Sequence, residues 1–190
     1  MDTLETIAGR RSIRRFKDEP IPDEVLETVL NAATQAPSGK NRQPWHFCVV
    51  QGDQRAEMVR VMREGIDVVV GFGINPGSSR GTARVMAQAP VTVFVFNPHG
   101  KHVFGKPPQE QVWDPVDTQS IGAAIQNMLL AAHDLGLGSL WICDVFYALD
   151  GLCQWLGRED QMVAAVSLGY PDEQPAARPR RPVEAVTTWV

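Results

Sequence analysis

The stretch Val91-Thr92-Val93-Phe94-Val95-Phe96 is a near-continuous apolar run of β-branched and aromatic residues. Such a run, without regular polar positions, predicts a strand whose two faces are both covered. Shorter runs of similar character predict further strands at residues 46–50, 139–143 and 161–168. The chain is therefore expected to build a sheet buried inside the molecule.

Helical spacing of apolar residues surrounds these strands. It predicts helices at residues 2–9, 22–36, 53–64 and 147–156. A longer helix is expected to begin with Asp117 or Thr118 as its N-cap and to run through Leu135, before Gly136. Residues 71–82, which are rich in Gly, Ser and Pro, and residues 97–117, which contain four Pro, predict loops.

Composition limits the class of protein. The 190 residues, 44% hydrophobic and 21% charged, fit one folded domain spanning residues 1–190. The net charge of −4 argues against a nucleic-acid partner. No apolar run approaches the ~20 residues of a membrane-spanning helix, so no membrane partner is expected.

Cysteine and histidine usage excludes two other classes. Cys48, Cys143 and Cys153 form no CxxC pair, which argues against a disulfide framework or a Cys-based zinc site. The tetrapeptide from His99 to His102 contains no carboxylate, so no metal site is expected there. The start of the chain also lacks the pattern of a signal peptide, and we therefore expect a cytoplasmic protein.

Positive charge is concentrated at two places in this acidic chain. Five of the eight residues from Arg10 to Lys17 are cationic, and a second cluster reads Arg178-Pro179-Arg180-Arg181. An anionic ligand would relieve the repulsion within each cluster. The alternative is that both clusters are solvated patches beside acidic helices.

The C-terminal arm, about residues 171–190, has two parts. Residues 171–182 are Pro-rich, and the end of the chain regains apolar character at Val183, Val186, Trp189 and Val190. An apolar terminal segment is expected to bury itself. It can pack on its own core or add to a partner subunit.

Four motifs occur in order along the chain: Arg10-Arg11-Ser12-Ile13-Arg14, the stretch from Ala36 to Trp45 (APSGKNRQPW), the stretch from Gly136 to Ile142 (GLGSLWI), and Gly169-Tyr170-Pro171 followed by Arg178-Pro179-Arg180. In this order they resemble the nitroreductase family of FMN-dependent NAD(P)H oxidoreductases, essentially from end to end. The resemblance implies a fold of the α+β class, with helices and strands mixed along the chain (α/β mixed). In this fold, helices flank a central sheet that is mixed or antiparallel. It also implies a homodimer that exchanges its C-terminal segments and holds FMN at the interface.

The resemblance brings the two basic clusters together at the FMN phosphate. It implies phosphate contacts from Arg10, Ser12, Arg178 and Arg180, with Arg11 in the same turn. Guanidinium groups suit a phosphate dianion because they form charge-assisted hydrogen bonds in fork geometry.

Arg14 resembles the family's basic residue near the pyrimidine edge of the flavin. A fixed cation there would stabilise the negative charge of the reduced ring. The alternative roles for Arg14 are another phosphate contact or a surface ion pair.

Two further segments are expected beside the flavin. The loop before the first strand would contribute Pro37, Ser38, Asn41 and Gln43. The segment after the third strand matches the one that crosses a face of the ring, and it would contribute Ile142, Cys143 and Asp144. Either Cys143 or Asp144 would give a backbone N–H near flavin N5. The Cys143 thiol is not expected to react, because nothing near it in the sequence argues for a lowered pKa.

The implied chemistry is a ping-pong reaction on the flavin. NADH or NADPH would deliver hydride, and a small electron-poor acceptor, such as a nitroaromatic or a quinone, would then be reduced. No catalytic side chain is expected, because flavin N5 carries the chemistry. The alternatives are another reaction on the same flavin platform, such as reductive dehalogenation or flavin fragmentation, and a flavin-binding module without turnover.

Overall fold

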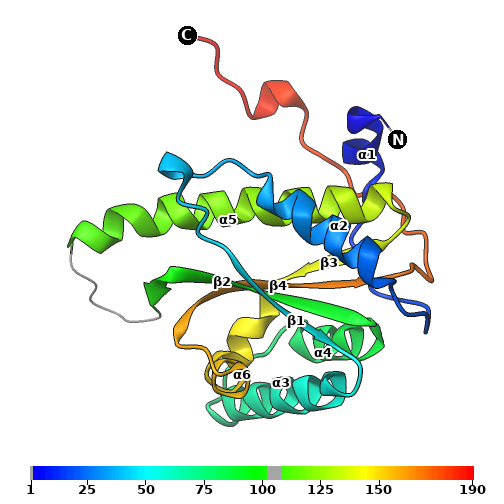
Figure 1. The fold of residues 1–190 in the computed structure, drawn as a ribbon, viewed down its shortest axis with the longest axis vertical. Coiled ribbons are helices and arrows are strands. Elements are labelled where there is room, and N and C mark those ends of the chain that lie inside the picture. Colours follow the sequence, from blue (N-terminus) through cyan, green and yellow to red (C-terminus); the bar gives the residue numbers. More distant parts are fainter. Residues whose placement is uncertain (1, 102–107) are drawn as a thin grey trace.

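A four-stranded sheet lies at the centre of the computed structural model, which describes residues 2–101 and 108–190 (Figure 1). Its order is β1 (His46–Gln51), β2 (Val91–Lys101), β4 (Asp160–Gly169) and β3 (Gly138–Ile142). Each neighbouring pair is antiparallel. The four predicted strands are confirmed, and the α+β fold class with them.

The apolar run in β2 is covered on both faces, as its composition predicts. Val91, Val93 and Val95 belong to one hydrophobic cluster, whereas Phe94 and Phe96 belong to the other. All five side chains are buried. Successive side chains of a strand point to opposite faces, so this one strand contributes to both cores.

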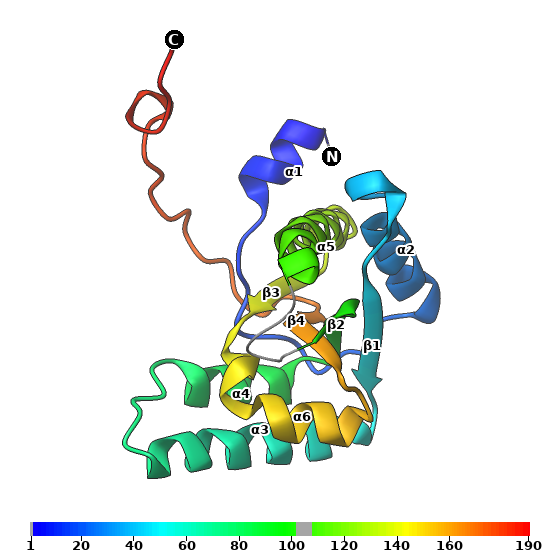
Figure 2. The ribbon, with the colours of Figure 1, turned by 90° about the vertical axis from the view of Figure 1, so that its left-hand side faces the viewer.

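Helices cover both faces of the sheet (Figures 1 and 2). One layer consists of α2 (Asp23–Thr34) and α5 (Pro108–Asp134), which share a core. The other consists of α3 (Gln54–Gly71), α4 (Ser79–Gln88) and α6 (Leu149–Leu156). Three short 3₁₀ helices, η1 (Gly39–Asn41), η2 (Asp144–Ala148) and η3 (Val183–Ala185), lie between longer elements or in the arm. The N-terminal helix α1 (Thr3–Gly9) lies beside α5.

The prediction of a loop over residues 97–117 is wrong at both of its ends. β2 continues to Lys101 and α5 begins at Pro108, while residues 102–107 lie outside the described residues. Pro115 removes one backbone donor from α5 without ending the helix. The fully buried side chains of Ile121 and Ile125 pack the following turns into the core. Asp117 is therefore an internal residue of α5 and not its N-cap.

The helix predicted at residues 53–64 is too short, and a second helix was missed. α3 runs on to Gly71, and the first four residues of α4 fall in the predicted loop of residues 71–82. Both helices are held by packing, because Met62 and Ile66 of α3 and Met86 of α4 are almost fully buried in one cluster. Tertiary packing of this kind overrides the poor helix propensity of Gly81.

The C-terminal arm leaves the sheet and extends away from the body of the molecule (Figure 2). Its apolar side chains remain in solvent: Val183, Val186 and Trp189 are 63%, 61% and 90% exposed. The chain therefore does not cover its own core with the arm, and exchange with a partner subunit stays a prediction. In the part of the chain that the structure describes, no helix combines the length and the hydropathy needed to cross a bilayer.

Candidate functional site

The basic turn at residues 10–17 runs between β3 and the start of the C-terminal arm. The amide of Ile13 donates to the Ser139 carbonyl at 2.9 Å, and Ser12 forms a parallel bridge with Ser139. Further along, the amide of Lys17 donates to Tyr170 at 2.9 Å. These backbone contacts fix the turn against two segments that are far away in the sequence.

Glu173 fastens the arm to this turn. Its Oε1 atom accepts hydrogen bonds from the backbone amides of Arg14, at 2.5 Å, and Arg15, at 3.2 Å. Its Oε2 atom lies 3.5 Å from the Nε of Arg15. Two adjacent backbone amides thus donate to one carboxylate, and this arrangement favours the negatively charged form of Glu173.

The turn and the arm enclose a basic hollow of about 580 Å³. It is lined by the five residues predicted at the phosphate, Arg10, Arg11, Ser12, Arg178 and Arg180, and also by Arg14, which was predicted at the edge of the flavin ring. Across residues 2–101 and 108–190, no carboxylate forms an ion pair with Arg10, Arg178 or Arg180. Burial, then the charges of Arg180 and Arg11, lower the pKa of Arg10. The hollow therefore holds positive charge that the described residues do not neutralise.

Arg11 differs from the other cations of the hollow. Its guanidinium donates to the carbonyl oxygens of Ala8, Gly9 and Arg10 at 2.7, 3.1 and 2.9 Å. These carbonyls lie at the C-terminal end of α1, where a cation is favourable. The structure thus gives Arg11 a capping role that the sequence did not suggest.

A second hollow, of about 410 Å³, runs along the end of β3. It is lined by the predicted residues Ile142, Cys143 and Asp144, and Arg14 lines both hollows. Burial, followed by the charge of Asp144, raises the pKa of the Cys143 thiol. A raised pKa disfavours the thiolate, so Cys143 is not an activated nucleophile.

One wall of the second hollow was not predicted from the sequence. Ser78, Gly81 and Thr82 line it from the start of α4. Both hydroxyl groups donate to Oδ2 of Asp144, Ser78 at 3.0 Å and Thr82 at 2.5 Å. Because these residues fall in a stretch that was predicted as loop, no helical pattern pointed to them. Asp144 therefore joins α4 to the end of β3.

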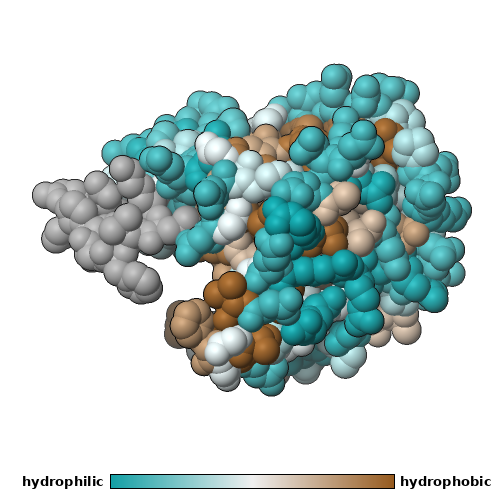
Figure 3. Space-filling model, turned by 90° about the horizontal axis from the view of Figure 1, so that it is seen from below, coloured by the Kyte–Doolittle hydropathy of each residue, from teal (hydrophilic) through white to brown (hydrophobic). Residues whose placement is uncertain are grey.

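Several exposed apolar side chains precede Ser78 in the sequence. Val68, Phe72 and Ile74, at the end of α3 and just after it, are 60%, 79% and 52% exposed. Figure 3 views the molecule from the α3 side and shows a mostly hydrophilic face with hydrophobic surface at its lower corner and in further patches near its middle and its upper edge. The segment that precedes Ser78 therefore exposes apolar side chains to solvent.

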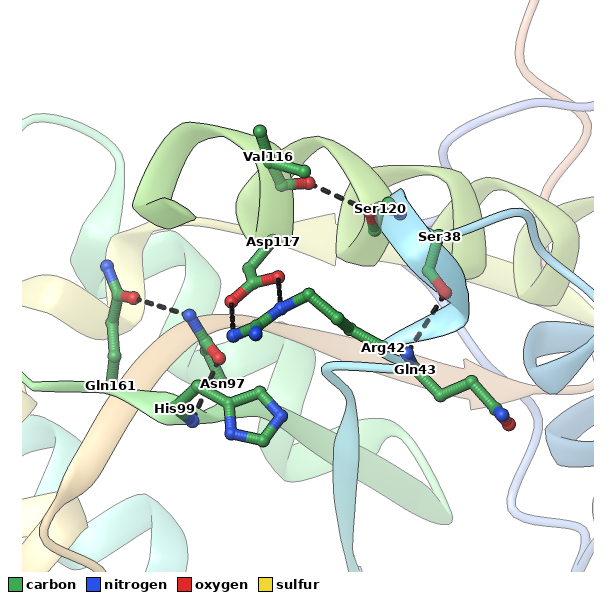
Figure 4. A network of polar contacts seen from close by, with 10 residues as sticks. Ser38, Arg42, Gln43, Asn97, His99, Val116, Asp117, Ser120 and Gln161 are labelled. Carbon is green, nitrogen blue, oxygen red and sulfur yellow. Dashed lines mark hydrogen bonds and ion pairs between the residues drawn. The ribbon is translucent and has the colours of Figure 1, made fainter. Parts of the chain in front are cut away.

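The predicted loop residues Pro37, Ser38, Asn41 and Gln43 do not line either hollow of their own chain. They lie between α2 and β1, over the first half of α5 (Figure 4). The hydroxyl of Ser38 accepts from the amide of Gln43 at 3.0 Å, and the amide of Gly39 donates to Ser120 at 3.4 Å. Within one chain, the predicted site is therefore divided: the loop from Pro37 to Gln43 lies apart from the two hollows.

The fold and these hollows define an α+β protein with an unneutralised cationic site at one end of its sheet. The model of the nitroreductase family matches residues 7–170, and the chain belongs to this family.

Individual relatives agree with this assignment. A protein of Methanothermobacter thermautotrophicus, named as an NADH dehydrogenase/NAD(P)H nitroreductase, is 32% identical over 94% of this chain and 82% of its own length. The iodotyrosine deiodinase of Drosophila melanogaster is 30% identical over 89% of this chain and 62% of its own length. A nitroreductase crystallised in complex with FMN, from Desulfovibrio desulfuricans, has a TM-score of 0.77 and 29% identity, covering 100% of this chain and 97% of that one.

Proposed function

We propose that this protein is an FMN-dependent oxidoreductase that takes hydride from NADH or NADPH and reduces a small electron-poor acceptor. The observation that carries the proposal is the basic hollow, whose cations Arg10, Arg178 and Arg180 have no carboxylate partner among the described residues. A phosphate dianion fits such a donor set, because several guanidinium groups can hold it by charge-assisted hydrogen bonds. The FMN complex of the Desulfovibrio relative supports the choice of cofactor.

The arrangement of the two hollows suits a molecule that has an anionic end and a flat end. Arg10, Ser12, Arg178 and Arg180 would hold the phosphate, while the backbone from Ile142 to Asp144 would border the ring. Arg14 lines both hollows, which supports a place for its cation between the phosphate and the polar edge of the ring. From that place it would stabilise negative charge on the reduced ring.

The residues of this chain would bind and orient reactants rather than transfer protons. When bound, FMN supplies the acceptance and donation of hydride at its N5 atom. The chain would contribute a fixed cation, backbone donors and an open hollow next to apolar surface. We therefore assign no catalytic side chain. Nitroaromatics and quinones, as electron-poor aromatic compounds, are the proposed acceptors.

We further propose a homodimer in the cytoplasm. The exposed apolar side chains at the end of the arm support a second copy as the surface that covers them. The loop from Pro37 to Gln43, which lines neither hollow of its own chain, would then complete the site of the partner. The three free cysteines fit a reducing compartment.

A dehalogenase activity on the same flavin is the second candidate, favoured by the likeness to the iodotyrosine deiodinase. Anaerobic stopped-flow mixing with NADH and with NADPH tests both candidates. Loss of the visible absorption band of oxidised flavin on mixing, followed by its return with a nitroaromatic or a quinone, supports the proposal. Return of the band only with a halogenated phenol supports the dehalogenase. A bound flavin that neither nucleotide reduces would identify a binding module.

A further inference from the structure

The loop from Ser38 to Gln43 holds an unfavourable backbone conformation. Lys40, Asn41 and Gln43 have positive φ angles of 52°, 54° and 49°. Positive φ is rare for residues that carry a Cβ, and a run of them persists only where the surrounding contacts determine it. The loop must therefore be held by interactions outside its own backbone.

Arg42 supplies the strongest of these interactions. Its Nε and one terminal nitrogen each lie 3.0 Å from an oxygen of Asp117, so the guanidinium and the carboxylate form a two-pronged pair (Figure 4). Asp117 is 1% exposed and lies inside α5. A carboxylate buried to this degree needs its partner, because charge that is left unpaired away from water is costly.

Trp113, one turn before Asp117 on the same helix, provides a second interaction that stabilises the loop. The Arg42 guanidinium lies 4.6 Å from the centre of the Trp113 ring, and Nζ of Lys40 lies 5.3 Å from it. Residues four apart on a helix lie on one face, so Trp113 and Asp117 both contact the guanidinium of Arg42 from the same side of α5. A Cβ on Gly39 would approach Val116 to 2.5 Å, so the loop also lies directly against α5.

We propose that Arg42 and Asp117 are positioning residues for flavin binding, which set the exposed polar side chains of Asn41 and Gln43, with Ser38, against the flavin of the partner copy. This inference rests on the proposed function, since it assumes that the loop contacts flavin. In this role neither Arg42 nor Asp117 would touch the cofactor itself. The pair acts by fixing a loop whose backbone does not favour the required shape.

The first test is Arg42→Lys, which keeps the charge but loses the planar fork. We expect flavin to bind about tenfold more weakly, roughly the effect of one lost hydrogen bond. The loss should be the same for FMN and riboflavin, because the loop would contact the ring and the ribityl chain and not the phosphate. Arg60→Lys is the matched control, since Arg60 pairs with Glu57 on the exposed face of α3. Equilibrium dialysis of both flavins gives the two dissociation constants.

A second variant separates positioning from stability. Arg42→Met leaves Asp117 buried without its partner and should lower the thermal midpoint. The double variant Arg42→Met with Asp117→Leu removes both charges, a change that often restores stability. We expect the double variant to regain the thermal midpoint while its flavin affinity and its visible circular dichroism remain altered.

The outcomes distinguish this inference from the proposed function. A wild-type protein that binds no flavin contradicts the proposed function. A wild-type protein that binds flavin, with Arg42→Lys or the double variant equal to it in affinity and spectrum, overturns the positioning role. Loss of FMN affinity alone, with riboflavin unchanged, also overturns it, because the effect would then lie at the phosphate.

Discussion

The carboxylate of Glu173 accepts a hydrogen bond from the backbone amide of Arg14 over 2.5 Å, although 159 positions separate the two residues. This contact joins the two segments that supply the cations of the basic hollow. Because Arg178 and Arg180 follow Glu173 closely in the arm, the contact limits where their guanidinium groups can lie. The basic hollow therefore depends on an acid that is not itself expected to touch the phosphate.

Replacing Glu173 by Ala should weaken FMN binding by about tenfold, since the arm loses charge-assisted hydrogen bonds to two amides. Riboflavin, which lacks the phosphate, should bind equally well before and after the change. Equilibrium dialysis measures both. Glu159→Ala, at an exposed position outside the hollow, serves as the control. A Glu173→Ala protein with unchanged FMN affinity would show that the arm is positioned by other contacts.

Direct removal of the phosphate contacts should have a larger effect. Arg10→Ala and Arg178→Ala are each expected to weaken FMN binding by about 2–3 kcal/mol, because each removes a charge-assisted contact to a dianion. Riboflavin should again be unaffected. Arg11→Ala offers a contrast, since its guanidinium caps α1 and its loss should mainly reduce thermal stability. If both single variants bind FMN as tightly as the wild type, the phosphate assignment is wrong.

Arg14→Gln should lower the two-electron reduction potential of the bound flavin. The physical reason is that a cation near the ring stabilises its anionic reduced form, so removal of the cation makes reduction less favourable. Anaerobic titration against a reference dye measures the potential. An unchanged potential would place the Arg14 side chain away from the ring, in spite of its position between the two hollows.

The stability of the protein should fall between pH 9 and pH 11, partly because of Cys153. Burial, and then Asp150 and Asp160, raise the pKa of this thiol from 9.0 to about 11. The unfolded chain therefore loses the thiol proton at a pH where the folded chain keeps it, and stability declines as the pH rises through this window. Since Cys153 is only partly buried, the contribution is about 1 kcal/mol or less.

Urea denaturation at several pH values, compared between the wild type and Cys153→Ala, isolates this contribution from the titration of lysines and tyrosines. The variant should show the shallower decline. Parallel curves for the two proteins would mean that Cys153 titrates alike in the folded and unfolded chains.

The sequence predicts the sheet better than it predicts the helices that shape the site. Strand β2 was predictable because a strand buried on both faces in the middle of a sheet shows a near-continuous apolar run. Helix α4 was not, since its first turn reads Ser79-Arg80-Gly81 and its stability comes from packing on α3. The same error concealed Ser78 and Thr82 as partners of Asp144.

Asp117 shows a second limit of sequence-based prediction. An acid near the start of a helical pattern is a natural N-cap, and Pro115 two residues earlier is a residue that ordinarily interrupts a helix. The hydrogen bond that Arg42 donates to Asp117 spans 75 positions, and no local sequence pattern encodes it. The basic hollow, by contrast, was expected, because the resemblance to the nitroreductase family brings the two clusters of like charge together at one phosphate.

Deletion of residues 183–190 should convert the protein toward a monomer and release FMN in parallel. Val183, Val186 and Trp189 are largely exposed in the single chain, and burying such side chains against a partner stabilises association by on the order of 1.5–3 kcal/mol each. Arg178 and Arg180 lie just before this segment, so loss of the crossing would also loosen two proposed phosphate contacts. FMN affinity would then depend on dimer formation.

Light scattering with absorbance detection at the flavin band follows mass and bound flavin together. We expect the truncated protein to elute with the mass of one chain and to be colourless at low concentration. Adding FMN in excess should restore part of the dimer, because a ligand held between two chains favours their association. The substitution Trp189→Ala should give an intermediate result, since it removes the largest apolar side chain of the segment and leaves the backbone in place. A truncated protein that stays dimeric and yellow would rule out exchange of the arm and leave its exposed apolar residues without a role in assembly.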